Sequence, residues 1–213
     1  MSNIAAVAFP DEYVLYPGNT IKQDNHYFQH REYNTEGENG PSQQAQRLRR
    51  KRRRRETHFY HTLTKTIIGE CVDRSVGTLV VGWPEDVRSN DLGKTANKWL
   101  HTWAYDRLYQ YLNYKGEEHG IEVLKENEWN TSQTCCCCEC GDTADSNRVD
   151  RGLYVCDSCG LVANADCNGA ENIRHKITPN PAVDRSPGCL AQPSVSLFAK
   201  SPGERVPQEQ GVP

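Results

Sequence analysis

Hydrophobic residues at the start of the chain gather in short runs separated by turn-forming residues. Residues 4–9 (IAAVAF) and 13–16 (YVLY) are apolar and rich in strand-forming residues, and 10–12 (PDE) has the composition of a turn between them. This arrangement predicts a β-hairpin. Residues 17–41 are polar, and we expect at most a third, edge strand near residues 26–30.

A long helix is predicted from Ser42 to about Val76, ending at Gly77. Ser42 is a good N-cap residue, and no proline follows it within the segment. Apolar side chains recur at near-helical spacing in the second half only, at Phe59, Leu63, Ile67, Cys71 and Val76. We therefore expect the second half to pack on the core and the first half to project from it.

The remainder of the chain alternates between strand and helix patterns. Residues 78–82 and 121–124 are predicted to be strands, with an amphipathic helix at about 97–119 between them. A last helix is expected at 166–176. Residues from 179 on contain many Pro, Ser and Gln and little to bury, which favours an extended or disordered tail. This order of elements predicts a mixed α/β fold.

Composition adds expectations about size and location. The chain has 213 residues, 36% of them hydrophobic, and a mean hydropathy of −0.79, so we expect long exposed segments. No apolar run approaches the ~20 residues of a membrane helix, and the start has neither a basic segment nor a long apolar one. We therefore predict a cytoplasmic protein with reduced cysteines and no membrane partner. The sequence does not specify an oligomeric state.

Positive charge is concentrated in one segment of the predicted long helix. The whole chain carries a net charge of only −3. Eight basic residues nevertheless fall within nine positions, namely Arg47, Arg49, Arg50, Lys51, Arg52, Arg53, Arg54 and Arg55. Such a stripe on an acidic body predicts a phosphate-binding surface. The alternative is a solvated helix or a disordered arm, and no aromatic residue interrupts the run to indicate base stacking.

The cysteines cluster in two knuckles of the form Cys-x-x-Cys-Gly. The preferred ligand set for a structural Zn²⁺ is Cys137, Cys140, Cys156 and Cys159, because a glycine follows each second cysteine. An alternative first pair is Cys135 and Cys138. Unligated thiols or a disulfide framework are the competing interpretations, and the spacing favours zinc.

Several carboxylates come after predicted strands or begin a predicted helix. Glu128 lies just past the strand at 121–124, Glu85 lies just past the strand at 78–82, and Asp166 begins the last helix. Clustered carboxylates are the ligands that Mg²⁺ needs for phosphodiester hydrolysis. The alternative for each is a solvated side chain or, for Asp166, a helix cap.

Three segments carry a family resemblance. TSQTC at 131–135, RVDRGLYVC at 148–156 and NADCNGAENI at 164–173, with the cysteine knuckles, closely resemble the C-terminal half of TnpB/OrfB-type transposon proteins, relatives of type V CRISPR nucleases. The resemblance extends upstream through 103–114 and the basic helix, and downstream into 184–197. It implies a RuvC-like, RNase H-type core with a four-cysteine zinc ribbon inserted before the final helix.

The resemblance also implies a division of the chain and a function. The core would occupy 1–130, the ribbon 131–163, the final core helix 164–178 and the tail 179–213. The family is similar to RNA-guided DNA endonucleases, so the implied partners are DNA and a guide RNA.

Within that family, three carboxylates bind Mg²⁺. Asp166 matches the last of them, and Glu128, or alternatively Glu85, matches the second. The first stands in an Asp-x-Gly motif on the first strand, and residues 3–8 resemble the segment immediately after that motif. We therefore expect an incomplete first strand, an N-terminally truncated DNA-binding protein of a mobile element, and little or no cleavage. The alternative is a non-catalytic zinc-ribbon protein that binds nucleic acid.

Overall fold

A computed structural model describes residues 3–37, 40–83, 104–137, 140–150, 152–178, 190–198 and 205–206. In chain order, its elements are β1 (Asn3–Ala8), β2 (Tyr13–Pro17), α1 (Asn19–Tyr33), β3 (Glu36–Gly37), β4 (Gly40–Pro41), α2 (Gln43–Asp73), β5 (Thr78–Trp83), α4 (Ala104–Glu118), β6 (Glu122–Asn127), η2 (Asp145–Asn147), β7 (Leu153–Val155), β8 (Val162–Asn164), α5 (Ala165–Ile177), β9 (Ser194–Val195), β10 (Leu197–Phe198) and β11 (Arg205–Val206).

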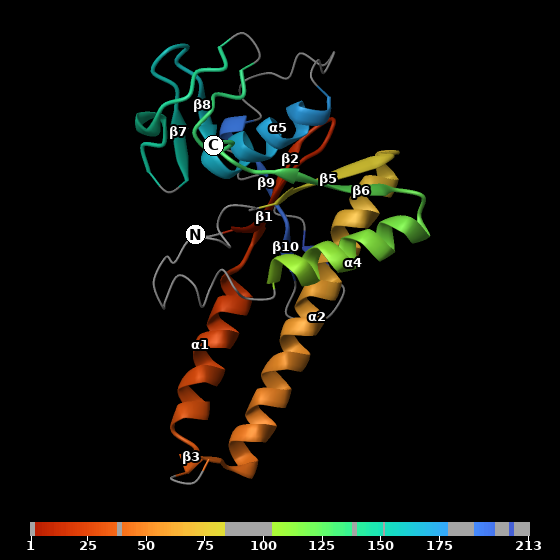
Figure 1. The fold of residues 1–213 in the computed structure, drawn as a ribbon, viewed down its shortest axis with the longest axis vertical. Helices are drawn as coiled ribbons and strands as arrows, with labels where there is room; N and C mark the ends of the chain where they lie inside the picture. Colours follow the sequence, from red (N-terminus) through yellow and green to blue (C-terminus); the bar gives the residue numbers. More distant parts are fainter. Residues whose placement is uncertain are drawn as a thin grey trace.

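The long strands lie between two sets of helices. Helix α5 and the small β7–β8 hairpin lie on one side of β1, β2, β5 and β6, and α4 and the upper half of α2 lie on the other (Figure 1). Helices α1 and α2 extend together away from these layers as a helical hairpin. This arrangement confirms the predicted mixed α/β class.

The predicted N-terminal hairpin is confirmed. Strands β1 and β2 pair antiparallel, with Val7 opposite Val14, and the Phe9 amide donates to the Glu12 carbonyl across the turn at 2.9 Å. The hairpin alternates its side chains between two cores. Val14 and Tyr16 face the α2 and α4 side, whereas neighbouring residues of β2 pack with the cysteine-rich segment. The strands are therefore buried on both faces, which accounts for their continuous apolar runs.

The tail contributes an ordered strand to this hairpin. Strand β9 pairs parallel with β2, and the Ser196 amide donates to the Leu15 carbonyl at 2.9 Å. Leu190 is buried in the same cluster as Leu15. Residues 190–198 of the predicted extended tail therefore include a short strand and a buried leucine, because a few apolar side chains suffice when they meet an open sheet edge.

The second pair of strands is joined by a helical crossover. Strands β5 and β6 pair parallel over six residues each, and both were predicted, although each is longer than expected. Helix α4 confirms the predicted amphipathic helix from Ala104 onward, and its expected start at 97 lies outside the described residues. Gly120 has φ +70° at the end of α4. This left-handed conformation favours glycine and allows the chain to turn into β6.

Residues 19–33 correct the sequence analysis. The expected edge strand near 26–30 is wrong, because the segment forms α1. Ile21 and Phe28, seven residues apart, are both buried, which places them on the same face of the helix. The pattern was hard to recognise, since the rest of the segment is polar and the helix is covered by α2 along only one side.

Helix α2 begins and projects as predicted. The Ser42 hydroxyl accepts a hydrogen bond from the Ala45 amide at 3.1 Å, which confirms the N-cap. The basic half projects from the sheet, but α1 lies alongside it (Figure 1). The helix ends at Asp73 rather than at Gly77, and Ser75 takes the left-handed conformation, with φ 53°.

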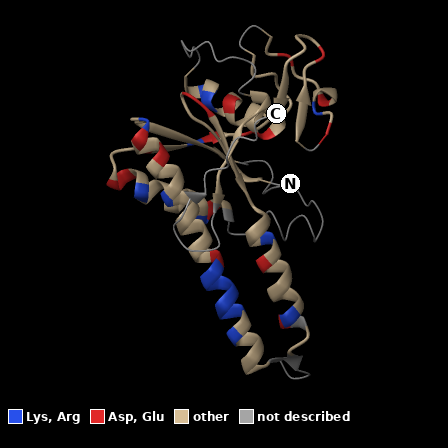
Figure 2. Ribbon diagram, turned by 180° about the vertical axis from the view of Figure 1, so that it is seen from behind, with Lys and Arg blue, Asp and Glu red and all other residues tan. Residues whose placement is uncertain are grey.

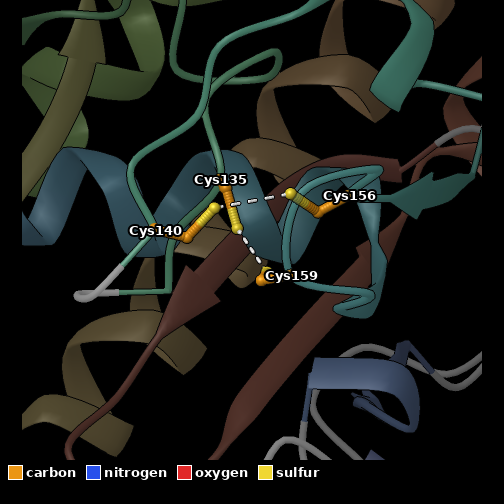
Figure 3. Close-up of side chains that lie close together, drawn as sticks. All are labelled: Cys135, Cys140, Cys156 and Cys159. Carbon is orange, nitrogen blue, oxygen red and sulfur yellow. Dashed lines mark hydrogen bonds between the residues drawn. The ribbon is translucent and has the colours of Figure 1, made fainter.

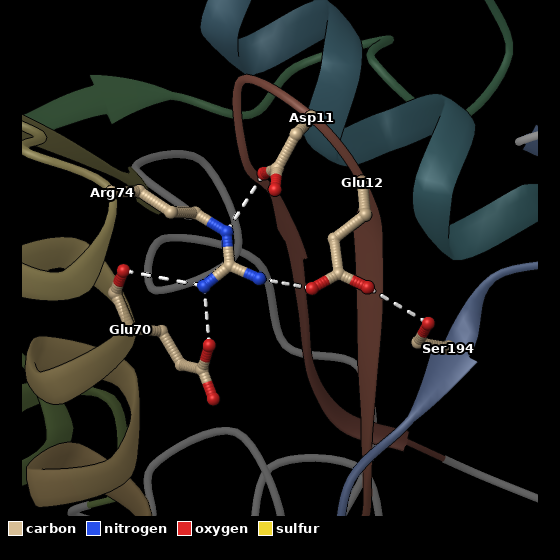
Figure 4. Close-up of polar contacts among 5 residues, drawn as sticks. All are labelled: Asp11, Glu12, Glu70, Arg74 and Ser194. Carbon is tan, nitrogen blue, oxygen red and sulfur yellow. Dashed lines mark hydrogen bonds and ion pairs between the residues drawn. The ribbon is translucent and has the colours of Figure 1, made fainter.

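An arginine joins three distant parts of the fold after α2 ends. The Arg74 guanidinium contacts Asp11 at 2.7 Å and also bonds the Glu12 and Glu70 carboxylates (Figure 4). The other oxygen of Glu12 accepts a hydrogen bond from the Ser194 hydroxyl at 2.8 Å. The network ties the β1–β2 turn, the end of α2 and β9 together.

Helix α5 comes directly after the ribbon hairpin. The Asn164 side chain caps it by accepting bonds from the amides of Asp166 and Cys167 at 3.0 and 3.3 Å. The predicted last helix is confirmed, and the cap is Asn164 rather than Asp166. Within the described ranges, no helix combines the length and the apolar character that crossing a membrane requires.

Candidate metal centre and nucleic-acid surface

Four cysteines meet between the 135–141 loop and the turn after β7. The Sγ atoms of Cys135, Cys140, Cys156 and Cys159 all lie within 4.8 Å of one another (Figure 3). Two Sγ–Sγ distances, Cys135 to Cys159 and Cys140 to Cys156, are 3.6 Å. A tetrahedral Zn²⁺ with Zn–S bonds of about 2.3 Å requires sulfur atoms about 3.8 Å apart. The donor set and its dimensions therefore fit a structural zinc.

The cluster differs from the expected ligand set at one position. Cys135 takes the place predicted for Cys137, and it pairs with Cys140 rather than with Cys138, which lies outside the described residues. Cys137 instead begins the tight turn, and its carbonyl accepts bonds from the amides of Cys140 and Gly141 at 3.0 and 3.2 Å. The predicted turn exists, with Gly141 at φ +56°, and the described cluster takes one residue from each predicted register, Cys135 from one and Cys140 from the other.

The surroundings of the cluster set the protonation of its thiols. Burial opposes ionisation of Cys156, but amide donors from Cys159 and Ser158 outweigh it and lower the pKa of Cys156 to about 7. Burial raises the pKa of Cys135 well above its ordinary value. A metal would therefore meet one thiol that ionises readily and one whose proton it must displace.

Two asparagines of α5 hold the loop that precedes the cysteines. The Asn168 amide nitrogen donates to the Thr134 carbonyl at 2.8 Å and to the Thr131 carbonyl at 3.5 Å, and its oxygen accepts from the Cys136 amide at 3.1 Å. Asn172, one turn later, donates to the same two carbonyls at 2.7 and 2.8 Å. We call these hydrogen bonds from Asn168 and Asn172 the asparagine clasp. The sequence analysis missed them, although two asparagines four residues apart on a helix share one face.

Asp166 lies beside the start of the first strand. Its carboxylate accepts a hydrogen bond from the Asn3 amide at 2.7 Å, across 163 residues of sequence. The first turn of α5 also places this carboxylate near the positive end of the helix dipole. Asp166 is the residue that the family resemblance matches to the last metal-binding Asp.

Glu128 lies in a tight space between β5 and α5. Its Oε2 atom is 3.2 Å from where a Cβ atom on Gly82 would stand, and the Ile173 Cδ1 atom is 2.6 Å from the same point. Burial raises the pKa of Glu128 above its ordinary value. The glycine thus leaves room for both side chains. The alternative carboxylate, Glu85, lies outside the described residues.

The described carboxylates do not complete a magnesium site. Over the described ranges, the four cysteines are the only group of three or more candidate ligands whose atoms approach closely enough to share an ion. Within the described residues, neither Glu128 nor Asp166 therefore belongs to a close group of three candidate ligands. Because two-metal hydrolysis needs such a set, this part of the chain does not fit Mg²⁺ by itself.

The predicted basic stripe lies entirely on α2. Lys and Arg residues colour a continuous stretch of its projecting half (Figure 2). Arg52 is half-buried, and the other seven predicted residues are exposed, namely Arg47, Arg49, Arg50, Lys51, Arg53, Arg54 and Arg55. The stripe is therefore a solvent-facing, ordered helix rather than a disordered arm.

Two family models match separate parts of the chain. OrfB_IS605, described as "Probable transposase", matches residues 1–88, and a model described as "Cas12f1-like, TNB domain" matches residues 105–173. The first match covers the hairpin, the basic helix and β5. The second runs from α4 through the cysteine cluster into α5.

Curated relatives agree with these matches. The chain is 35% identical over 113 residues to the CRISPR-associated endodeoxyribonuclease Cas12f1 of Sulfoacidibacillus thermotolerans, covering 53% of this chain and 25% of that protein. It is 28% identical over 189 residues to the TnpB-like protein ORF457 of Acidianus two-tailed virus, covering 81% of this chain and 39% of that protein. The chain thus spans less than half of either relative.

A structure of the Cas12f1-sgRNA-target DNA complex matches with a TM-score of 0.61 and 21% identity, covering 78% of this chain and 44% of that one. This likeness shows a shared fold. Fold and site together define a mixed α/β protein with a four-cysteine cluster inserted before its last core helix. The family models and the relatives together support a TnpB-type protein, as the sequence analysis expected from the resemblance to OrfB transposon proteins.

Proposed function

We propose that this chain binds nucleic acid through α2 as part of a TnpB-type mobile-element protein, with DNA and a guide RNA as partners. The observation that carries the proposal is the gathering of eight basic side chains on one ordered, projecting helix (Figure 2). Arginine suits this role because its planar guanidinium binds phosphate oxygens bidentately. Relatives of this chain include proteins named as CRISPR-associated endodeoxyribonucleases, which supports a nucleic-acid partner.

We infer that the four clustered cysteines hold a structural zinc ion. Cys135, Cys140, Cys156 and Cys159 would occupy all four tetrahedral positions, so the ion would supply a cross-link and no reactive site. Its effect would be to hold the ribbon against α5, where Asn168 and Asn172 already bind the preceding loop. Cys137 is the matched control, because it lies in the same loop outside the cluster.

Metal analysis of two variants tests this ligand set. Cys135→Ser should reduce bound zinc and lower the melting temperature, whereas Cys137→Ser should retain one zinc per chain. Measuring zinc by inductively coupled plasma mass spectrometry after dialysis separates the two outcomes. Loss of zinc from Cys137→Ser with retention in Cys135→Ser would restore the register preferred from sequence.

Binding without cleavage is the activity that the described residues support. Glu128 and Asp166 would be magnesium ligands of the family site, but the described part of the chain supplies no third carboxylate beside them. We therefore expect the chain to bind DNA or RNA and to leave it uncut when Mg²⁺ is added. Magnesium-dependent cutting that disappears in Asp166→Ala would contradict this expectation.

Fluorescence anisotropy with labelled oligonucleotides tests the binding itself. Affinity should fall steeply as salt rises, because each phosphate contact releases a condensed counterion. Neutralising the stripe by changing all eight basic residues to Gln should abolish most of the binding and flatten the salt dependence. Unchanged binding by a folded variant would remove α2 from the function.

A further inference from the structure

The basic stripe on α2 has two edges with different partners. On one edge, Arg49 and Arg52 each lie 3.4 Å from a carboxylate oxygen of Glu32, which is buried on α1. Arg55 binds both oxygens of Asp24, also on α1, at 2.6 and 2.9 Å. Helix α1 therefore neutralises this edge, and its arginines serve chiefly to hold the two helices together.

The other edge is open and hollowed. A pocket of about 590 Å³ runs along it and is lined by Arg50, Arg53, Arg54, Thr57, His58 and His61. These positions follow the helical repeat, so they form one continuous edge about 16 Å long at 1.5 Å per residue. Within the described ranges, Arg50 and Arg54 have no carboxylate partner. Their charge is therefore available to an external anion.

His61, at one end of this edge, belongs to an aromatic cluster. The His61 ring stacks on the Tyr111 ring of α4, with centroids 4.1 Å apart and an angle of 15° between the rings. The Tyr114 hydroxyl lies 3.3 Å from His61 Nδ1, and Lys115 donates to the His61 carbonyl at 2.7 Å. The basic run itself contains no aromatic residue, so this cluster exists only because α4 packs beside α2.

The state of His61 favours stacking over charge. Burial lowers the pKa of His61, and the nearby charges of Lys115, His58 and Arg107 lower it further. The ring is therefore neutral at pH 7.5. A neutral ring supported by Tyr111, on the same edge as three guanidinium groups, has the composition of a single-strand binding groove, in which cations follow the phosphates and aromatic rings stack on the bases.

We propose that the open edge of α2 binds single-stranded nucleic acid, with phosphates at Arg50 and Arg54 and an unpaired base at His61. The proposal rests on the proposed function and adds which edge of the helix and which form of nucleic acid it takes. Duplex nucleic acid fits less well, because its stacked bases do not offer a free face to His61.

Two double variants with the same change in net charge test which edge binds. Arg50→Gln/Arg54→Gln changes the open edge, and Arg49→Gln/Arg55→Gln changes the edge covered by α1 and leaves Arg52 to pair with Glu32. For a labelled 12-nucleotide single strand at pH 7.5, the open-edge variant should bind at least tenfold more weakly. Its salt slope should fall by about 1.4, since each single-strand phosphate contact contributes about 0.7. The control should lose at most about threefold in affinity.

Base stacking is tested with His61 and an abasic oligonucleotide. His61→Ala should weaken binding about five- to tenfold with the salt slope unchanged, and His61→Phe should restore affinity, because a stacked base contributes independently of charge. A strand without bases should bind wild type and His61→Ala equally. Melting curves show whether each variant folds. If His61→Ala does not fold, the affinity of His61→Phe is compared with that of wild type on the normal and the abasic strand.

The outcomes separate this proposal from the proposed function. Equal losses in the two arginine variants would overturn the edge assignment while leaving nucleic-acid binding by α2 intact. The stacking site would be overturned if a duplex bound more tightly than a single strand. It would also be overturned if His61→Ala weakened binding of the abasic strand as much as binding of the normal strand. If neither arginine variant affects binding, the edge assignment is overturned, and the proposed function fails with it only if the variant with all eight basic residues changed to Gln also binds unchanged.

Discussion

The asparagine clasp on α5 yields a prediction about stability that does not depend on metal or nucleic acid. Asn168 and Asn172 both donate to the carbonyls of Thr131 and Thr134, whereas only Asn168 accepts from the Cys136 amide. Asn168 is fully buried, and Asn172 is half-buried. Removal of Asn168 therefore affects one more group than removal of Asn172 does, namely the Cys136 amide.

The contacts set the size of each effect. Asn168→Ala leaves the buried Cys136 amide without its acceptor, which costs about 1–3 kcal/mol, and also removes a hydrogen bond to Thr134 worth about 1 kcal/mol. We expect a loss of about 2–4 kcal/mol in the free energy of unfolding. Asn172→Ala should cost only about 0.5–1.5 kcal/mol, because Asn168 still serves both carbonyls.

The double variant should show strong coupling. Only when both asparagines are absent do the Thr131 and Thr134 carbonyls lose every side-chain donor that the structure gives them. The combined loss should therefore exceed the sum of the single losses by about 1–2 kcal/mol. The two single variants lie one turn apart on the same helix face, so each is the control for the other.

Urea unfolding followed by circular dichroism, in buffer with fixed zinc, measures these differences. For a chain of this size, the Asn168→Ala loss corresponds to a fall in melting temperature of about 4–16 °C, at 2–4 °C per kcal/mol. Equal effects of the two single variants, or strictly additive effects in the double variant, would refute the assignment of shared carbonyls.

Three further predictions concern the packing of β5, the arginine network and the metal. Gly82→Ala should destabilise the protein by about 1–3 kcal/mol, since the new Cβ meets Ile173 Cδ1 at 2.6 Å, and adding Ile173→Val should recover part of the loss in a thermal melt. A Gly82→Ala melt identical to wild type would contradict this packing. Arg74→Met should cost about 2 kcal/mol, because it removes the guanidinium that pairs with the buried Glu70 carboxylate, and Glu70→Gln in that background should restore stability in urea titrations. Zinc should be retained at pH 8 and lost progressively as the pH falls, because protons compete with the metal for the four cysteine thiolates. A chromogenic chelator assay across pH 4 to 8 measures the release, and full retention at pH 4 would argue against thiolate ligation.

Local patterns predicted most of the elements but placed the ligands of the metal site less well. The serine cap, the two hydrophobic strand pairs and the last helix depend on neighbouring residues, and all of them appear where expected. The choice among five neighbouring cysteines does not depend on spacing alone. Cys135 is held beside an isolated β-bridge between Thr134 and Thr143, where its amide donates to the Asp142 carbonyl at 2.7 Å.

The sequence by itself indicated the resemblance to TnpB-type proteins, the mixed α/β class, the basic helix and the presence of a cysteine-rich ribbon, because motifs, caps and periodicity are local properties. Tertiary structure alone decided three further features. It selected Cys135 over Cys137, it neutralised one edge of α2 with Glu32 and Asp24, and it placed Tyr111 beside His61. In each case the deciding partner lies on another element of the fold or beyond a turn of the chain. Such contacts form only when burial of the two cores brings those elements together.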